Sequence, residues 1–280
     1  MLFRSSGHPP TTSTKEDHLI VAESLRSPQI TSAAVATKMK SKGVSISSTT
    51  VQRRLKKAGL SFLPLVNKPL LTEAHWKRRL LWAKENQQRE WDQVLFTDEC
   101  TFKLHHKKNH AWQKRGKRMI GRTVKHPAKV HFWGCVSANG FGQGCTFTKN
   151  LNAAGLITIY QHALLPSAKS LFGPHNSTWV LQEDNDPKHK SKLATQWKAS
   201  HNISTLPWPA QSPDLNCIEN VWGVLKANVA ARRAKTVKGL RKVIQEEWKK
   251  LGREYAAKLV GSMEIRVQEV IAVKGDVIMY

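Results

Sequence analysis

The sequence predicts a mixed α/β sheet with flanking helices, preceded by a small all-α domain. Two observations predict this fold class. Up to about residue 60, apolar residues recur with helical spacing only, in short segments that begin at capping residues. From residue 94 onward, short apolar runs typical of strands come first and then alternate with helical segments, which is the order of a layered α/β domain.

Composition restricts the class of protein. The chain has 280 residues, 40% of them hydrophobic, so it can bury a core in one large or two smaller domains and is not a disordered polycation. No apolar run is long enough to span a membrane, and the N-terminus lacks the apolar centre of a signal peptide. The cysteines form no C-x-x-C pair, which favours reduced thiols in an intracellular protein: they are Cys100, Cys135, Cys145 and Cys217.

The charge balance predicts a polyanionic partner. The chain carries 45 Lys and Arg against 20 Asp and Glu, a net charge of +25. Nucleic acid is the simplest such partner, because basic side chains displace the counterions condensed on phosphates. A basic membrane-surface protein is the alternative, but it needs a cationic amphipathic helix with an aromatic apolar face, and no segment shows one cleanly.

The N-terminal part predicts a DNA-binding domain. Residues 1–14 are rich in Ser, Thr, Pro and Gly and predict a flexible segment. Three short helices follow within 15–60, and the last is basic; this order predicts a helix-turn-helix, with an ordinary helical bundle as the alternative. Residues 1–60 carry ten basic and three acidic residues, which favours DNA. The DNA contacts predicted on the third helix are Ser48, Thr49, Gln52, Arg53 and Lys56.

Residues 61–93 predict a linker and a bridging helix. Prolines break the first part, and the segment 71–87 is helical with Trp76, Leu80 and Ala83 on one side. The domain predicted at 94–280 contains all the strands, and its last part, from residue 226, is helical and basic. Strands are predicted at 94–99, 101–104, 129–137, 142–148, 178–184 and 203–208, with helices between and after them.

Acidic residues are rare and clustered in the middle of the chain. Residues 94–225 hold 16 Lys and Arg but only seven acids, in three short clusters. Exclusion of acids where DNA passes, and their retention where metal ions bind, explains this pattern; scatter by chance is the alternative. The seven are Asp98, Glu99, Glu183, Asp184, Asp186, Asp214 and Glu219.

Three of these acids are the candidate catalytic and metal-ligating residues. Asp98 and Asp184 each close a predicted strand, and Glu219 lies in the first turn of a predicted helix. Because sites in open α/β sheets form outside the carboxyl ends of strands, the two Asp side chains can face one pocket. Carboxylates are hard oxygen ligands of the kind that Mg²⁺ takes, beside substrate phosphates. The three acids therefore predict a magnesium site.

Each acid also has a purely structural interpretation. Asp98 can be a surface acid, and Asp184 and Asp186 can form a turn. Glu219 can close a helix capping box, and Asp214 can brace the turn before the helix. An apolar stripe on that helix predicts packing on the sheet, with Glu219 about 100° away at the rim. The stripe consists of Ile218, Val221, Trp222, Leu225 and Val229.

The predicted catalytic acids lie in three motifs: "VLFTDE", "DNDPKH" and "WPAQSPDLNCIENVW". Together these motifs resemble those of mariner-superfamily transposases, in the nematode-type branch whose catalytic acids are two Asp and a Glu. The resemblance implies a ribonuclease-H-like catalytic domain behind a bipartite helix-turn-helix region. The family keeps 34 residues between its last two acids, and 34 residues lie between Asp184 and Glu219. This spacing selects Asp184, whereas Asp186 is expected to shape the turn and Glu183 to face the other side of the sheet.

The resemblance implies cut-and-paste DNA transposition in the nucleus. Such enzymes bind terminal inverted repeats in double-stranded DNA and hydrolyse phosphodiester bonds, and the freed 3′-hydroxyl attacks target DNA at a TA dinucleotide. By this likeness Asp98 bridges two Mg²⁺ ions, for which Mn²⁺ substitutes, and Asp184 and Glu219 each complete one site. Lys188 and His189 are predicted phosphate contacts, with a solvated loop as the alternative. The sequence leaves open whether a homodimer forms.

A basic segment between the predicted strands is a further candidate for DNA contact. Residues 107–129 hold nine Lys and Arg and no acid. They predict a hairpin that follows the DNA backbone, and a solvated basic loop is the alternative. The predicted contacts there are Lys114, Arg115, Lys117 and Arg118.

The chain departs from the family pattern in three places. "GHPP" at 7–10 stands where the family has a Gly-Arg-Pro-Arg hook, and the first of two DNA-binding subdomains is expected to be absent. Cys217 replaces a proline before the catalytic Glu, and a glycine run is missing near 126–134. A truncated, catalytically silent DNA-binding relic or a host-adapted DNA-binding protein is therefore the alternative to an active transposase. A stand-alone ribonuclease-H-like nuclease is a weaker one.

Overall fold

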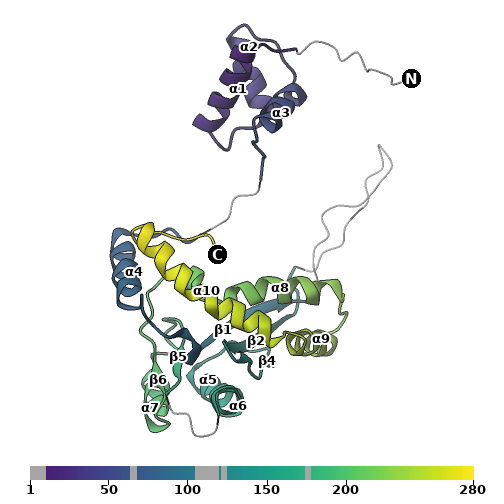
Figure 1. Ribbon diagram of the computed structural model, residues 1–280. Coiled ribbons are helices and arrows are strands. Elements are labelled where there is room, and N and C mark those ends of the chain that lie inside the picture. The colour runs from purple at the N-terminus through teal and green to yellow at the C-terminus, as the bar shows by residue number, and fades with distance from the viewer. Residues whose placement is uncertain (1–10, 64–67, 105–119, 121–124, 174–177) are drawn as a thin grey trace, which may run out of the picture. The chain divides into compact units, whose positions relative to one another are not determined.

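The computed structural model describes residues 11–63, 68–104, 120, 125–173 and 178–280 (Figure 1). The chain divides into two compact units, Met1–Asn67 and Lys68–Tyr280. The boundary between the units falls within the predicted linker and bridging helix at 61–93, and the helix lies in the second unit.

The first unit consists of three short helices: α1 (Thr14–Arg26), α2 (Ser32–Ser41) and α3 (Ser48–Lys57). Each begins at a hydroxyl N-cap whose side chain accepts a backbone N–H two or three residues into the helix, at Ser13, Thr31 and Ser47. Four apolar side chains, at least one from each helix, form a core that excludes water: Ile20, Val35, Met39 and Val51. The three predicted helices are confirmed, with Thr31 as the cap of the second.

A six-stranded mixed sheet forms the centre of the second unit. Its strand order is β3-β2-β1-β5-β6, and β4 pairs with the other part of β2. β1 pairs antiparallel with β2 and parallel with β5, and β5 pairs parallel with β6. The strands are β1 (Val94–Lys103), β2 (Lys129–Ser137), β3 (Gly140–Phe141), β4 (Cys145–Phe147), β5 (Val180–Gln182) and β6 (Ser204–Thr205).

The first strand corrects the sequence-based prediction. Two short strands were expected at 94–99 and 101–104, with Asp98 at the end of the first; the structure has one ten-residue strand, β1, with Asp98 in its middle. The reason is pairing: β1 loses its parallel partner β5 after Phe96 but stays paired with β2 as far as Lys103. Asp98 therefore lies beyond the end of β5, although its own strand continues.

Helices cover both faces of the sheet (Figure 1). One face carries α5 (Ala153–Ile159), the π-helical turn η2 (Tyr160–Leu164), α6 (Leu165–Phe172) and α7 (Lys192–Ser200). The opposite face carries α4 (Glu73–Glu85), α8 (Ile218–Ala231), α9 (Val237–Lys249) and α10 (Arg253–Ala272). Short 3₁₀ turns, η1 (Trp91–Gln93) and η3 (Pro213–Leu215), precede β1 and α8. Two apolar cores result, one on each side of the sheet.

Helix α4 buries a face that only partly matches the predicted one. Of Trp76, Leu80 and Ala83, which were expected to line the apolar side, Ala83 is buried, but Trp76 is exposed and Leu80 half-buried; Arg79 and Trp82 are buried beside Ala83. An ion pair and a hydrogen bond to residues far along the chain explain why α4 buries this face. The Arg79 guanidinium pairs with Asp214, and the Trp82 indole N–H donates to the carbonyl of Pro207.

All four cysteines are free thiols, in agreement with the expected reduced state. Within the described ranges, no helix combines the length and the apolarity that crossing a bilayer requires.

Candidate active site

A cavity of about 340 Å³ opens where β1 passes the end of β5, facing the start of α8. Four of the described residues that line it are Asp or Glu, and none is Lys, Arg or His. In a chain of net charge +25, this local excess of negative charge requires a specific reason. The acids are Asp98, Asp184, Asp186 and Glu219, so all three predicted catalytic residues meet at one cavity.

Asp98 is fixed by hydrogen bonds to both carboxylate oxygens. The backbone N–H of Glu99 donates to Oδ1 at 2.7 Å, and the indole N–H of Trp222 donates to Oδ2 at 2.8 Å. Burial, together with the nearby charge of Glu219, raises the pKa of Asp98 to about 7. A carboxyl group with this pKa lacks a compensating cation, because an adjacent positive charge lowers the pKa instead.

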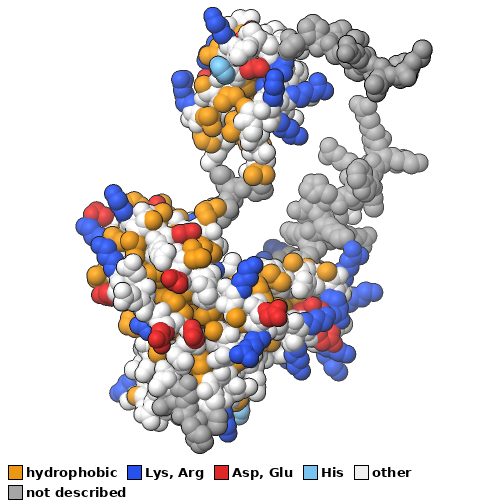
Figure 2. Space-filling view, in the orientation of Figure 1, with side chains coloured by type: hydrophobic (Ala, Val, Ile, Leu, Met, Phe, Trp, Pro, Cys, Tyr) orange, Lys and Arg blue, Asp and Glu red, His pale blue; other side chains and the backbone are white. Residues whose placement is uncertain are grey.

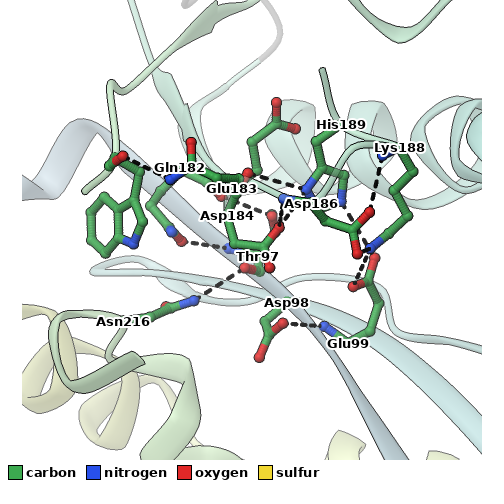
Figure 3. A network of polar contacts seen from close by, with 12 residues as sticks. Thr97, Asp98, Glu99, Gln182, Glu183, Asp184, Asp186, Lys188, His189 and Asn216 are labelled. Carbon is green, nitrogen blue, oxygen red and sulfur yellow. Dashed lines mark hydrogen bonds and ion pairs between the residues drawn. The ribbon is translucent and has the colours of Figure 1, made fainter. Parts of the chain in front are cut away.

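Asp184 follows β5 by two residues and is half exposed, with 54% of its side chain accessible. The N–H of Asp186 donates to its carboxylate at 2.9 Å, and His189 Nδ1 lies 2.8 Å from the same oxygen (Figure 3). Burial favours the neutral acid, but these two partners outweigh it and lower the pKa of Asp184. The group is therefore ionised throughout the neutral range.

Glu219 lies in the first turn of α8, at the rim of the cavity. The helix buries the apolar stripe predicted for it, so Glu219 lies where the helical spacing placed it. Partial burial of the carboxyl raises the pKa of Glu219, and Lys226 and Lys68 partly offset this rise. The capping-box alternative is wrong, because α8 has no capping side chain at its N-cap, Cys217, and the Asn216 side chain accepts the N–H of Ile218 and donates to the carbonyl of Thr97.

Lys188 and His189 turn inward rather than toward solvent. The Lys188 ammonium pairs with Asp186 at 2.9 Å and with Glu99 at 3.3 Å (Figure 3). Burial lowers the pKa of His189, but hydrogen bonds to Asp184 and Glu99 outweigh it and raise this pKa to about 9. In this structure the charges of both residues face carboxylates, so phosphate contact stays a prediction for both. The solvated-loop alternative is wrong for His189, because this side chain is buried.

Glu183 belongs to the opposite side of the sheet. Its carboxylate accepts the hydroxyl of Tyr160 and pairs with the ammonium of Lys198, and all three side chains are buried. The prediction that Glu183 faces away from Asp184 is confirmed. Asp186 accepts the N–H of Lys188, so it shapes the turn as expected, although it also lines the cavity.

Two roles were missed by sequence reasoning. Trp222 was assigned only to the apolar stripe, but its indole N–H reaches Asp98. Asp214 was expected to brace a turn; it is fully buried in a bidentate pair with Arg79 and also accepts the N–H of Ile278. The spacing of Trp222 three residues after Glu219 was a usable signal, since residues three apart lie on neighbouring parts of one helix face. No local pattern indicates the partner of Asp214.

The cavity has the chemistry of a divalent-cation site without a closed cluster of ligands. In the part of the chain that the structure describes, no group of three His, Cys, Asp or Glu side chains lies close enough to hold an ion. The donors nonetheless fit: they are hard carboxylate oxygens, and the pKa of Asp98 and of Glu219 is raised, whereas Asp184 is paired with His189 and Asp186 with Lys188. An open set of acids suits a cation that also takes ligands from a substrate.

The predicted DNA contacts on α3 form a polar surface opposite the core. Val51 is buried, whereas Thr49, Gln52, Arg53 and Lys56 are exposed and Ser48 is half-buried. Figure 2 shows Lys and Arg side chains spread over the visible face of this unit, with few acids among them. The contacts predicted at Lys114, Arg115, Lys117 and Arg118 lie outside the described residues.

Comparison with protein families gives two matches. A model described as DDE superfamily endonuclease matches residues 93–241, and a transposase helix-turn-helix model matches residues 17–88. The first match contains the whole cavity, and the second contains most of α1 and all of α2 and α3. Together they define a class: DNA-acting endonucleases of the DDE superfamily with a helix-turn-helix region.

Curated relatives come from nematodes. The chain is 32% identical to the Tcb1 transposase of Caenorhabditis briggsae over 239 residues, which are 82% of this chain and 86% of that protein. It is 31% identical to the Tc1 transposase of Caenorhabditis elegans, covering 84% of this chain and 88% of that protein. The chain belongs to the Tc1/mariner family of transposases.

Solved structures share the fold. A Mos1 transposase paired-end complex with the left transposon end superposes with a TM-score of 0.77 at 17% identity, over 99% of this chain and 83% of that one. A Mos1 paired-end complex with Mn gives a TM-score of 0.75 at 17% identity, over 98% and 82%. At these identities the likeness establishes the fold, and it agrees with the predicted ribonuclease-H-like mixed sheet.

The comparisons correct one expectation. A missing first DNA-binding subdomain is not borne out, because a transposase helix-turn-helix region is matched at 17–88. The chain also spans 98% of the Tcb2 transposase of Caenorhabditis briggsae at 31% identity.

Proposed function

We propose that this protein is an active DNA transposase. It binds the terminal inverted repeats of its element, hydrolyses phosphodiester bonds in a divalent-metal-dependent reaction, and transfers the freed 3′-hydroxyl ends to a TA target in nuclear DNA. The observation that carries the proposal is the cavity with four acids and no basic residue in its described lining, in a strongly basic chain. An acidic cavity in a basic protein suits a site that binds metal cations next to the phosphates of a polyanion.

Asp98, Asp184 and Glu219 are the residues that would hold the cations. When bound, two Mg²⁺ or Mn²⁺ ions would supply Lewis acidity and stabilise the oxygens that attack and leave at phosphorus. Asp98 is suited to a shared position, because its strand pairs with β5, which leads to Asp184, and its carboxylate accepts from Trp222 on the helix that carries Glu219. The Mos1 complexes with Mn and with Mg support the choice of ions.

No side chain in the described lining is needed as a covalent nucleophile. Water and then a 3′-hydroxyl can attack phosphorus directly, so the task of the protein is to position and stabilise. Cys100 and Cys217, near the acids in sequence, are buried thiols whose pKa is raised by burial, Cys217 to about 12. Neither supplies a thiolate at neutral pH.

Recognition of the element's ends is assigned to the first unit. The exposed face of α3 would enter the major groove of double-stranded DNA, with Gln52 and Arg53 directed at base edges and phosphates. The solved Mos1 structures include a paired-end complex and a pre-cleavage transpososome, which supports action as a homodimer on two ends.

The test is cleavage of DNA that carries the inverted repeats flanking the gene. We expect purified full-length protein to nick and join such DNA with Mg²⁺ or Mn²⁺, and Asp98→Ala, Asp184→Ala and Glu219→Ala each to abolish it. Asp186→Asn is the matched control, since it keeps an acceptor for the N–H of Lys188 and removes an acid from the same cavity. Salt-sensitive binding to the repeats without cleavage in either cation would mean a silent DNA-binding protein instead.

A further inference from the structure

We propose that Trp222 is a positioning residue that orients the Asp98 carboxylate toward the cavity for cation binding. The inference deepens the proposed function and rests on it. The indole N–H of Trp222 donates to Asp98 Oδ2 at 2.8 Å, while the N–H of Glu99 donates to Oδ1 at 2.7 Å. One donor on each oxygen sets the plane of the carboxylate.

The chemistry of the donor suits this task. An indole N–H is a neutral donor with no acceptor capacity, so it can hold an oxygen without cancelling its charge. A Lys or Arg in the same place would form an ion pair and compete with a cation for the carboxylate. Carboxylates that bind metals are commonly held by a neighbouring hydrogen bond of this kind, and its loss weakens metal binding.

The position of Trp222 is fixed by packing. Its side chain is 2% exposed, and its ring stacks on Trp248 with centroids 5.7 Å apart and meets Phe132 edge to face at 6.0 Å. Trp248 is itself anchored, because its indole N–H donates to the carbonyl of Gly142 at 2.8 Å. The indole of Trp222 therefore has little freedom to leave Asp98.

A glycine on the neighbouring strand makes room for this packing. Gly134 lies directly opposite Asp98 in the β1–β2 register. A Cβ at this position would lie 2.7 Å from Trp248 Cη2 and 3.1 Å from Trp222 Cη2, closer than these rings can accommodate without moving. The rings of Trp222 and Trp248 thus pack on β2 at Gly134, the residue paired with Asp98.

Trp222 also couples two of the three acids. It lies one helical turn after Glu219 on α8, so the same helix presents one acid to the cavity and orients another. The separation of Asp98 and Glu219 therefore depends on how α8 packs against β1.

The experiment compares two Trp→Phe variants of the full-length protein. Trp222→Phe removes the N–H that reaches Asp98, and Trp197→Phe removes an indole N–H from the core on the opposite face of the sheet, beside Tyr160. Mn²⁺ affinity is measured by the electron paramagnetic resonance signal of free Mn²⁺, and cleavage is measured against Mn²⁺ concentration. We expect Trp222→Phe to weaken Mn²⁺ binding by about tenfold and to regain most of its cleavage rate at high Mn²⁺. Trp197→Phe should keep the wild-type affinity.

A second variant separates orientation from packing. Replacing the Trp222 side chain with its benzothienyl analogue keeps the bicyclic shape and removes only the N–H donor. This variant should bind Mn²⁺ as weakly as Trp222→Phe while unfolding at the wild-type denaturant concentration. Wild-type affinity in the analogue would overturn the inference, whatever the stability of Trp222→Phe.

Asp98→Ala distinguishes failure of this inference from failure of the proposed function. If Asp98→Ala loses Mn²⁺ binding but both Trp222 variants keep it, the site stands and the role of Trp222 is wrong. If wild-type protein binds Mn²⁺ no better than Asp98→Ala, the assignment of Asp98 as a ligand fails, and the inference about Trp222 fails with it.

Discussion

Arg79 on α4 and Asp214 in the turn before α8 form a bidentate ion pair, with Nη1–Oδ1 at 2.8 Å and Nη2–Oδ2 at 2.7 Å. Both side chains are essentially inaccessible to solvent. The guanidinium also donates to the hydroxyl of Ser212 and to the carbonyl of Gly275. The pair therefore ties α4, the segment leading to Glu219 and the C-terminal residues into one network.

Removing one partner of this pair should destabilise the second unit strongly. Arg79→Met or Asp214→Asn leaves the other group buried without its counter-charge, and we expect a loss of about 3–5 kcal/mol in the free energy of unfolding. Denaturant unfolding measures it. Lys77→Ala is the control, because Lys77 pairs with Glu73 on the exposed side of the same helix. This exposed pair should contribute at most about 0.5 kcal/mol.

The stability of the metal-free protein should fall as the pH rises from about 4 to about 7. The pKa of Asp98 is about 7 in the folded protein, against an ordinary value of 3.8, so the folded state binds the proton more tightly than the unfolded state. The stabilisation is complete below about pH 4 and is lost as the pH passes through about 7, with a magnitude of order 4 kcal/mol. Denaturant midpoints in a chelator measure it.

The corresponding control isolates Asp98 from the other acids. Asp98→Asn should flatten the stability profile between pH 4 and 7, and Asp186→Asn should not. Saturating Mn²⁺ should have the same flattening effect on the wild-type protein, because a cation replaces the proton as the partner of the carboxylate. A wild-type profile that Asp98→Asn leaves unchanged would contradict the assignment.

His189 should produce a second, separate slope at higher pH. Its pKa is about 9 in the folded protein against an ordinary 6.5, because Asp184 and Glu99 hold the imidazolium despite its burial. The stabilisation is complete below about pH 6.5 and disappears as the pH rises through about 9, with a magnitude of order 3 kcal/mol. His189→Gln should remove this slope in unfolding experiments, whereas His201→Gln, at an exposed position after α7, should retain it.

DNA binding by the first unit should have an electrostatic component, which is independent of sequence, and a sequence-specific component. Arg53→Ala is expected to weaken binding to all sequences and to lower the slope of log affinity against log salt by about one. Gln52→Ala should reduce the preference for the inverted repeats while leaving the salt slope unchanged. Titrations of the two variants on specific and random duplexes over a range of salt measure both effects. Lys15→Ala on α1, outside the predicted surface, serves as the control.

Local periodicity predicted the fold well where a single face decides burial. On α8 the predicted stripe is the buried face, and the position of Glu219 beside it followed from helical spacing alone. The three N-terminal helices followed from capping residues, and β2 from its apolar run. In these elements the local pattern and the tertiary packing agree.

The prediction failed where distant partners decide the outcome. Nothing near Arg79 indicates that it is buried, because its partner Asp214 lies 135 residues away in the sequence. Asp98 was placed at a strand end, because the sequence does not show that β2 extends the pairing of β1 beyond β5. The bond from Trp222 to Asp98 spans 124 residues and depends on the helix and the strand being packed together.

The early end of β5 determines how a substrate can reach the site. β5 stops at Gln182, so beyond Phe96 no strand among the described residues lies beside this edge of β1. At this edge, side chains form hydrogen bonds with the backbone of β1: the amide oxygen of Gln182 accepts the N–H of Thr97, and Asn216 donates to the carbonyl of Thr97. A longer β5 would cover this edge with backbone and close the approach to Asp98. Under the proposed function, the length of β5 would therefore set the entrance for a DNA strand, independently of the acids proposed to bind the ions.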